Sequence, residues 1–112
     1  MDLAQTIYLL VVKKLPKEEL FSLSDQIRRA AVLIPSNIAE GQARNSPKEF
    51  QRYLAIARGS KAELETQLLL CVRVGYFTEN DISEPIALLR EIGKMLFALS
   101  NTLHKKAASR KP

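Results

Sequence analysis

Apolar residues recur along the chain at the three- and four-residue spacing of amphipathic helices, in four separate stretches. The first covers residues 2–14, and the second begins at residue 18 or 22 and runs to 43. The third covers residues 47–74, and the fourth begins near residue 78 and continues to about 104. The connections between them are short, which favours antiparallel neighbours. The pattern therefore predicts an all-α protein, an antiparallel up-down-up-down four-helix bundle.

Local signals mark the ends of these helices. Pro16 disfavours the α conformation in the residue before it, so the first helix should end there. Ser46, Pro47 and Glu49 have the spacing of a capping box with proline at the first helical position, which predicts the start of the third helix. Gly75 is suited to the left-handed position that commonly follows a helix.

The second helix contains a proline, Pro35, near its middle. Proline lacks a backbone N–H and costs about 3 kcal/mol in a helix interior. Ile34 and Ile38 continue the same apolar stripe before and after Pro35. We therefore expect the helix to continue through Pro35 with a kink. The carbonyl of Ala31 then loses its donor, and Ser36, Asn37 or a side chain of the third helix could satisfy the groups freed there.

The third and fourth helices carry more apolar surface than a monomeric bundle needs. Beside its core stripe, the third helix has a second stripe of mixed aliphatic and polar residues: Ile56, Ser60, Glu63, Gln67, Leu70 and Val74. The apolar sector of the fourth helix includes Leu88, Met95 and Phe97, and Pro85 either kinks this helix or delays its start. Since a surface helix of a monomer usually has a narrower apolar stripe, we expect a homo-oligomer.

The net charge of +5 resides at the end of the chain. Residues 1–91 hold twelve basic and twelve acidic side chains, and no acidic residue follows Glu91. We therefore divide the chain into a bundle domain, residues 1–104, and a basic tail, residues 105–112. Cations suit a helix C-terminus, so a solvated helix end is one interpretation, and an electrostatic contact for RNA or DNA is the other. The candidate nucleic-acid contacts are Arg90, Lys94, Lys105, Lys106, Arg110 and Lys111.

No aromatic platform accompanies this charge in the sequence. Tyr8, Tyr53 and Tyr76 are scattered along the chain and are interpreted as packing residues. We therefore expect salt-sensitive binding with weak sequence selectivity.

Catalytic chemistry is poorly represented. His104 is the single histidine, and the single cysteine, Cys71, lies on the predicted core stripe of the third helix. A pair of carboxylates, Glu40 and Glu63, could approach one groove, but Arg44 follows Glu40 at an ordinary ion-pair spacing. We expect no catalytic residue, cofactor, metal or small-molecule substrate. No apolar run reaches membrane-spanning length, so no membrane contact is expected, and the single cysteine suggests a reducing cytoplasm.

Several longer stretches carry a family resemblance. They are L-P-K-E-E at 15–19, Q-I-R-R-A-A-V-L-I-P-S-N-I-A-E-G at 26–41, R-N-S-P-K-E-F at 44–50, A-R-G-S-K-A-E-L-E-T-Q-L at 57–68, and Gly75-Tyr76. In these the chain resembles the four-helix-bundle proteins encoded in intervening sequences of bacterial 23S ribosomal RNA genes. That family also includes the accessory variability protein of diversity-generating retroelements.

The resemblance implies a four-helix bundle that assembles as a ring-shaped homopentamer. In the retroelement branch, it implies binding to a reverse transcriptase and to nucleic acid through a basic surface. The family assigns no catalytic role to its signature residues, which are here Arg29, Asn37, Glu40, Gly41, Arg44, Gly59, Ser60, Glu63 and Gln67. We interpret the polar ones as a structural network: Arg29, Asn37, Glu40, Arg44, Ser60, Glu63 and Gln67.

Two functional hypotheses follow. The first is a non-enzymatic oligomeric scaffold that contacts RNA, or a nucleic-acid-binding partner such as a reverse transcriptase. The second is a purely structural protein–protein interaction module with no nucleic-acid role. The basic end of the chain separates the two, since only the first hypothesis requires it.

Overall fold

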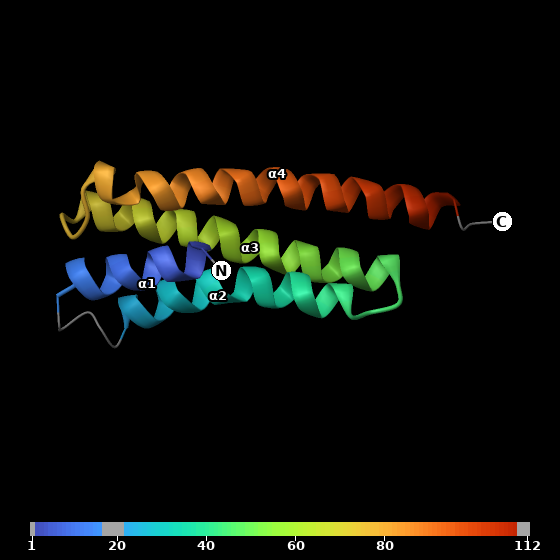
Figure 1. Cartoon of the computed structure of the whole chain (residues 1–112), viewed down its shortest axis with the longest axis horizontal. Helices are drawn as coiled ribbons and strands as arrows, with labels where there is room; N and C mark the ends of the chain where they lie inside the picture. The colour runs from blue at the N-terminus through green and yellow to red at the C-terminus, as the bar shows by residue number, and fades with distance from the viewer. Residues whose placement is uncertain (1, 17–21, 110–112) are drawn as a thin grey trace.

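The computed structural model describes residues 2–16 and 22–109. They form four helices and, within these ranges, no strand, which confirms the all-α prediction. The helices are α1 (Asp2–Lys14), α2 (Leu23–Gln42), α3 (Pro47–Arg73) and α4 (Glu79–Ser109). Together they make a rod of 57 × 23 × 20 Å (Figure 1).

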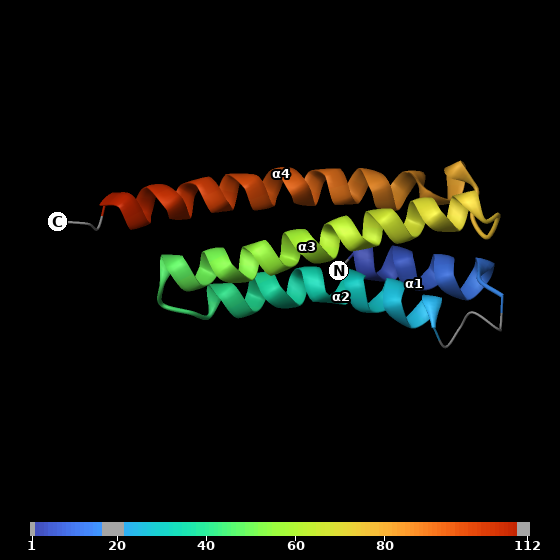
Figure 2. The same ribbon diagram turned by 180° about the vertical axis from the view of Figure 1, so that it is seen from behind.

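Each helix lies against its neighbours in the chain, and α1 also contacts α4. The most extensive contact is between α2 and α3. The turn between α2 and α3 lies at one end of the rod, and the turn between α3 and α4 lies at the other (Figures 1 and 2). Because α1 has 13 residues and α4 has 31, α1 covers only part of the length of α4.

The core consists of one apolar side from each helix. At the end of the rod that contains α1, the buried residues include Leu3, Ile7, Ile27, Ile34, Leu64, Leu68, Cys71 and Leu89. Further along α4, a second cluster contains Leu54, Ala57, Leu96 and Leu103, with Ile38, Phe50, Ile92 and Leu99 packed against it. These positions follow the predicted apolar stripes, so the helical periodicity correctly identified the core.

Both ends of α3 match the local signals. The Ser46 hydroxyl accepts a hydrogen bond from the Glu49 backbone N–H at 3.2 Å, and Pro47 opens the helix. The Glu49 carboxylate does not complete the expected box, because it accepts instead from Arg52 Nε at 3.0 Å. At the other end, Gly75 has φ of 89°, and the N–H of Tyr76 donates back to the carbonyl of Cys71 at 2.9 Å. This is a Schellman termination, in which glycine avoids a Cβ penalty.

A reciprocal capping box between Thr78 and Asp81 begins α4. The Thr78 N–H donates to Asp81 Oδ2 at 2.8 Å, and the Asp81 N–H donates to Thr78 Oγ1 at 3.1 Å. Lys14, in the last turn of α1, lies 3.8 Å from the same carboxylate. Asp81 therefore joins the end of α1 to the start of α4.

Both internal prolines lie within continuous helices. α2 continues through Pro35, as predicted. α4 already begins at Glu79, so the buried Pro85 does not delay the start of this helix, which was one of the two expectations. The Asn37 amide donates to the carbonyl of Leu33 at 2.7 Å rather than to that of Ala31.

The predicted end of the last helix was wrong, because α4 continues past His104 to Ser109. Its apolar pattern stops at Leu103, but lysine and alanine are good helix formers and the backbone stays helical. Lys105 and Lys106 therefore lie on a helix.

The second stripe predicted on α3 divides into two groups. Ser60 and Gln67 are buried, at 7% and 8% exposure, whereas Ile56, Leu70 and Val74 are exposed. The two polar residues therefore belong to the edge of the core, and the aliphatic ones remain on the surface.

The close contact of α2 and α3 depends on Gly41. A Cβ built at this position would lie 2.7 Å from Phe50 Cδ1 and 2.9 Å from Tyr53 Cβ. Gly59, in the middle of α3, has nothing within 4 Å of the equivalent position. Gly41 and Gly59 thus differ in what surrounds them.

We predict that Gly41→Ala destabilises the protein by about 1–3 kcal/mol, because the added methyl group forces α2 and α3 apart. The matched variant Gly59→Ala should stabilise it by up to about 1 kcal/mol through higher helix propensity. Urea unfolding followed by circular dichroism measures both. Equal effects of the two substitutions would contradict the close packing at Gly41.

We also predict how the stability of the protein depends on acidic pH through Asp81. The Thr78 backbone N–H, aided by Lys14, lowers the pKa of the Asp81 carboxyl. A depressed folded-state pKa contributes stability above the unfolded value of about 3.9, and this contribution is lost as the pH falls through the folded value. Wild-type stability should therefore fall more steeply than that of Asp81→Asn below about pH 5.

Chemical denaturation at a series of acidic pH values tests this difference. Glu91→Gln, which removes another carboxylate from the same helix, is the matched control. Parallel loss of stability in wild type and Asp81→Asn would show that the capping carboxylate is not stabilised by its partners.

Candidate nucleic-acid interface

The cations predicted to bind nucleic acid occupy two different places. Arg90, Lys94 and Lys105 are exposed on α4. Their spacing puts them on the side of the helix that faces away from the buried positions Leu89, Leu96 and Leu103. Arg110 and Lys111 lie outside the described residues.

Lys106 instead lines a surface cavity at the α2–α3 turn. This cavity has a volume of about 330 Å³ and is lined by Arg44, Asn45, Ser46, Pro47, Phe50, Leu103 and Lys106. Arg44, which the sequence analysis placed in a structural network, therefore faces the same cavity as a predicted nucleic-acid contact. Nothing in the sequence indicates this pairing, because Arg44 lies in the turn after α2 and Lys106 lies on α4, far apart along the chain.

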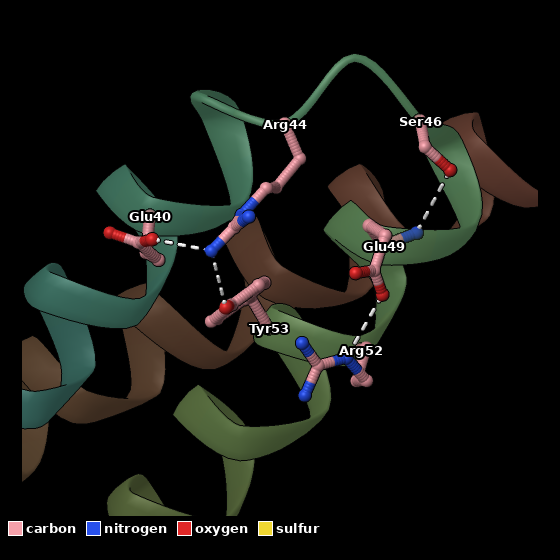
Figure 3. Close-up of polar contacts among 6 residues, drawn as sticks. All are labelled: Glu40, Arg44, Ser46, Glu49, Arg52 and Tyr53. Atoms are coloured by element: carbon pink, nitrogen blue, oxygen red, sulfur yellow. Dashed lines mark hydrogen bonds and ion pairs between the residues drawn. The ribbon is translucent and has the colours of Figure 1, made fainter.

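Arg44 is held in place by one neighbour on α2 and one on α3. Its Nη2 donates to Glu40 Oε1 at 2.8 Å and to the Tyr53 hydroxyl at 3.0 Å (Figure 3). Its guanidinium carbon also lies 5.3 Å from the centre of the Tyr53 ring. The phenol therefore acts as a polar partner as well as a packing residue, which its sequence position did not reveal.

Arg52 contacts the same ring, with its guanidinium carbon 4.7 Å from the ring centre. Its Nε donates to Glu49 at 3.0 Å, so the two carboxylates near the turn, Glu40 and Glu49, are both paired with arginine (Figure 3). Among residues 40–53 and 101–109 there are five lysines and arginines and two carboxylates. This end of the rod consequently carries an excess of positive charge.

The protonation states reinforce this charge distribution. Tyr53, and then Glu40, raise the pKa of the Arg44 guanidinium, and Glu49 raises that of Arg52. Reciprocally, Arg52 lowers the pKa of the Glu49 carboxyl. Arg44, Arg52 and Glu49 are therefore charged at neutral pH, and attraction of the two guanidinium groups to phosphate would weaken with salt rather than with small changes in pH.

The predicted polar network is distributed over several local contacts. Besides the Glu40–Arg44 pair and the local bond of Asn37, Gln67 Nε2 donates to Glu63 Oε1 at 3.2 Å. Ser60 is buried and Arg29 is exposed. The two carboxylates that could have formed an acid–base pair have different partners, Arg44 for Glu40 and Gln67 for Glu63.

One polar atom of this set is unsatisfied. Gln67 Oε1 is buried and accepts no hydrogen bond. It adjoins the exposed aliphatic side of α3, where Leu70 and Val74 reach the surface.

The residues that the structure describes contain no group of three or more histidine, cysteine or carboxylate side chains arranged to hold a metal ion. None of the helices in this part of the chain combines the length and apolarity needed to cross a bilayer.

Comparison with known proteins identifies the family of the chain. No curated protein matches the chain. The family model described as 23S rRNA-intervening sequence protein matches residues 1–98. The matched part includes α1, α2, α3 and the first two-thirds of α4, with Arg90 and Lys94, and ends before Lys105. A match over nearly the whole length, on a four-helix structure, shows that the chain belongs to the 23S rRNA-intervening sequence protein family.

Proposed function

We propose that this protein is a non-enzymatic, oligomeric helical scaffold of the cytoplasm that contacts nucleic acid, with RNA as the principal ligand. The observation that carries the proposal is the gathering of cations along α4 and at the α2–α3 turn, where both nearby carboxylates are paired with arginine. Such a surface attracts a phosphate backbone at long range. A nucleic-acid-bound protein such as a reverse transcriptase would meet the same surface.

The scaffold itself is proposed to be an up-down-up-down bundle that associates with copies of itself. The contacts between successive helices and the placement of the turns support this topology. Every helix also exposes large apolar side chains, namely Tyr8, Leu9, Val12, Val32, Leu33, Ile56, Leu69, Leu70, Val74, Met95 and Phe97. Contact between copies would cover much of this surface, and a ring of five subunits is the assembly that the family resemblance favours.

The same apolar surface favours a second candidate, a purely structural interaction module. That module would use the apolar sides of α1, α2 and α3 and would need none of the cations. The two candidates differ in whether the basic end binds RNA, so they are separated by measuring that binding directly.

We predict that light scattering at micromolar concentration gives several times the mass of one chain. The double variant Leu70→Glu with Val74→Glu should lower the mass of the particle. It introduces charge at exposed aliphatic positions that would lie in the contact between copies. Lys48→Glu, an exposed residue at the α2–α3 turn, is a control for the added charge. A wild-type protein that remains monomeric would overturn the oligomeric part of the proposal.

For the basic end, we predict that neutralising Lys105, Lys106, Arg110 and Lys111 to glutamine weakens binding to structured RNA at low salt. Each lost phosphate contact should reduce the slope of log affinity against log salt by about 0.9 on a duplex and about 0.7 on a single strand. Fluorescence anisotropy at several salt concentrations measures both quantities. The matched control replaces Lys13, Arg28, Arg29 and Arg73, which lie on α1, on α2 and at the end of α3 away from the α2–α3 turn.

An equal loss of RNA affinity in the two quadruple variants would show that the bundle as a whole, rather than its basic end, contacts RNA. Absence of RNA binding by the wild-type protein would favour the structural module.

A further inference from the structure

One face of α4 combines cations with an exposed aromatic ring. Arg90, Lys94, Phe97, Asn101 and Lys105 follow one another at intervals of three or four residues, so their side chains lie along one side of the helix. All five are exposed. We call these five residues the α4 stripe. It measures about 22 Å at 1.5 Å per residue, and Phe97 lies near its middle.

Phe97 is conspicuous because it contributes little to the core. Its exposed fraction is 66%, the highest among the large apolar side chains of the described residues, while the adjacent Leu96 is fully buried. An exposed phenylalanine on a packed helix costs solubility without stabilising the fold. Its position therefore suits a ligand that supplies an apolar surface and tolerates surrounding positive charge.

The charged side chains within the α4 stripe are all cations. Lys94 lies three residues before it, and Arg90 a further turn back. From residue 92 onward α4 contains no carboxylate. A partner protein would need an acidic surface matched to this spacing, whereas a nucleic-acid strand offers phosphates at regular intervals and a flat base between them.

We propose that the α4 stripe binds single-stranded nucleic acid, with a base stacked on the Phe97 ring and the flanking phosphates held by Arg90, Lys94 and Lys105. Asn101 supplies an amide that can donate to or accept from the base edge. The inference rests on the proposed contact with nucleic acid and specifies its strandedness. In a duplex the base faces are covered by stacking, so Phe97 has no partner there.

Replacing the ring tests the stripe without changing its charge. Phe97→Ala should weaken binding to a fluorescent oligouridine by about 5- to 150-fold, the equivalent of the 1–3 kcal/mol typical of one stacked base. Binding to an RNA duplex of equal length, and the salt slope on either ligand, should change little because the cations remain. Met95→Ala is the matched control, since Met95 is an exposed apolar residue, at 43%, on another side of the same helix.

Three results for Phe97→Ala would overturn the inference. In the first, the wild type binds oligouridine in a salt-dependent way and Phe97→Ala binds it equally well. This result would show that Phe97 does not stack on a base, and it would leave the proposed function intact. Equal losses on single strand and duplex would show a general effect on the helix. Dissociation of the oligomer by Phe97→Ala, measured by light scattering, would assign Phe97 to a contact between copies.

If the wild-type protein bound neither RNA, the stripe and the nucleic-acid role would fall together. Rescue of oligouridine binding by Phe97→Trp, which restores an aromatic face, would support the stacking contact.

Discussion

The burial of one apolar seam on α4 is the contact on which the rest of the structure depends. Leu89, Leu96 and Leu103 are buried at intervals of seven residues, so they hold α4 against the core along most of its length. Once this seam faces inward, the rotation of the helix about its axis is determined. Arg90, Lys94 and Phe97 must then face solvent, because each is displaced around the helix from the buried positions.

The second constraint is the close contact of α2 and α3 at Gly41. The absence of a side chain lets α2 approach Phe50 and Tyr53 directly. That approach brings the Tyr53 hydroxyl within hydrogen-bonding distance of Arg44, which in turn lies beside the cavity shared with Lys106. A packing requirement in the last turn of α2 thus positions the charges at this end of the bundle.

The sequence was a good guide wherever a local pattern determined the structure. Apolar periodicity gave the four helices, the Ser46 cap gave the start of α3, and Gly75 gave its end. The predicted end of α4 was wrong because apolar periodicity indicates only the residues that pack against the core. The helix continues beyond the last of these residues. The Thr78–Asp81 box was missed because the usual pattern has glutamate or glutamine in place of the aspartate.

The features of the candidate interface were less accessible to sequence reasoning. Ser60 and Gln67 are polar yet buried, and Phe97 is apolar yet exposed, so in each case the residue type opposes its location. The cavity between Arg44 and Lys106 requires the tertiary arrangement of α2, α3 and α4. Composition indicated a basic end, but only the packing of α4 shows which of its cations share a face with an aromatic ring.

The most direct test of this account is photochemical crosslinking of the intact protein to an oligouridine that carries 4-thiouridine, with the modified residue identified by tandem mass spectrometry. Trypsin releases residues 95–105 as one peptide, because cleavage follows Lys94 and Lys105. The account predicts that this peptide carries the principal crosslink and that the modified residue is Phe97. Principal crosslinks on the α1–α2 side, for example at Tyr8, would contradict it.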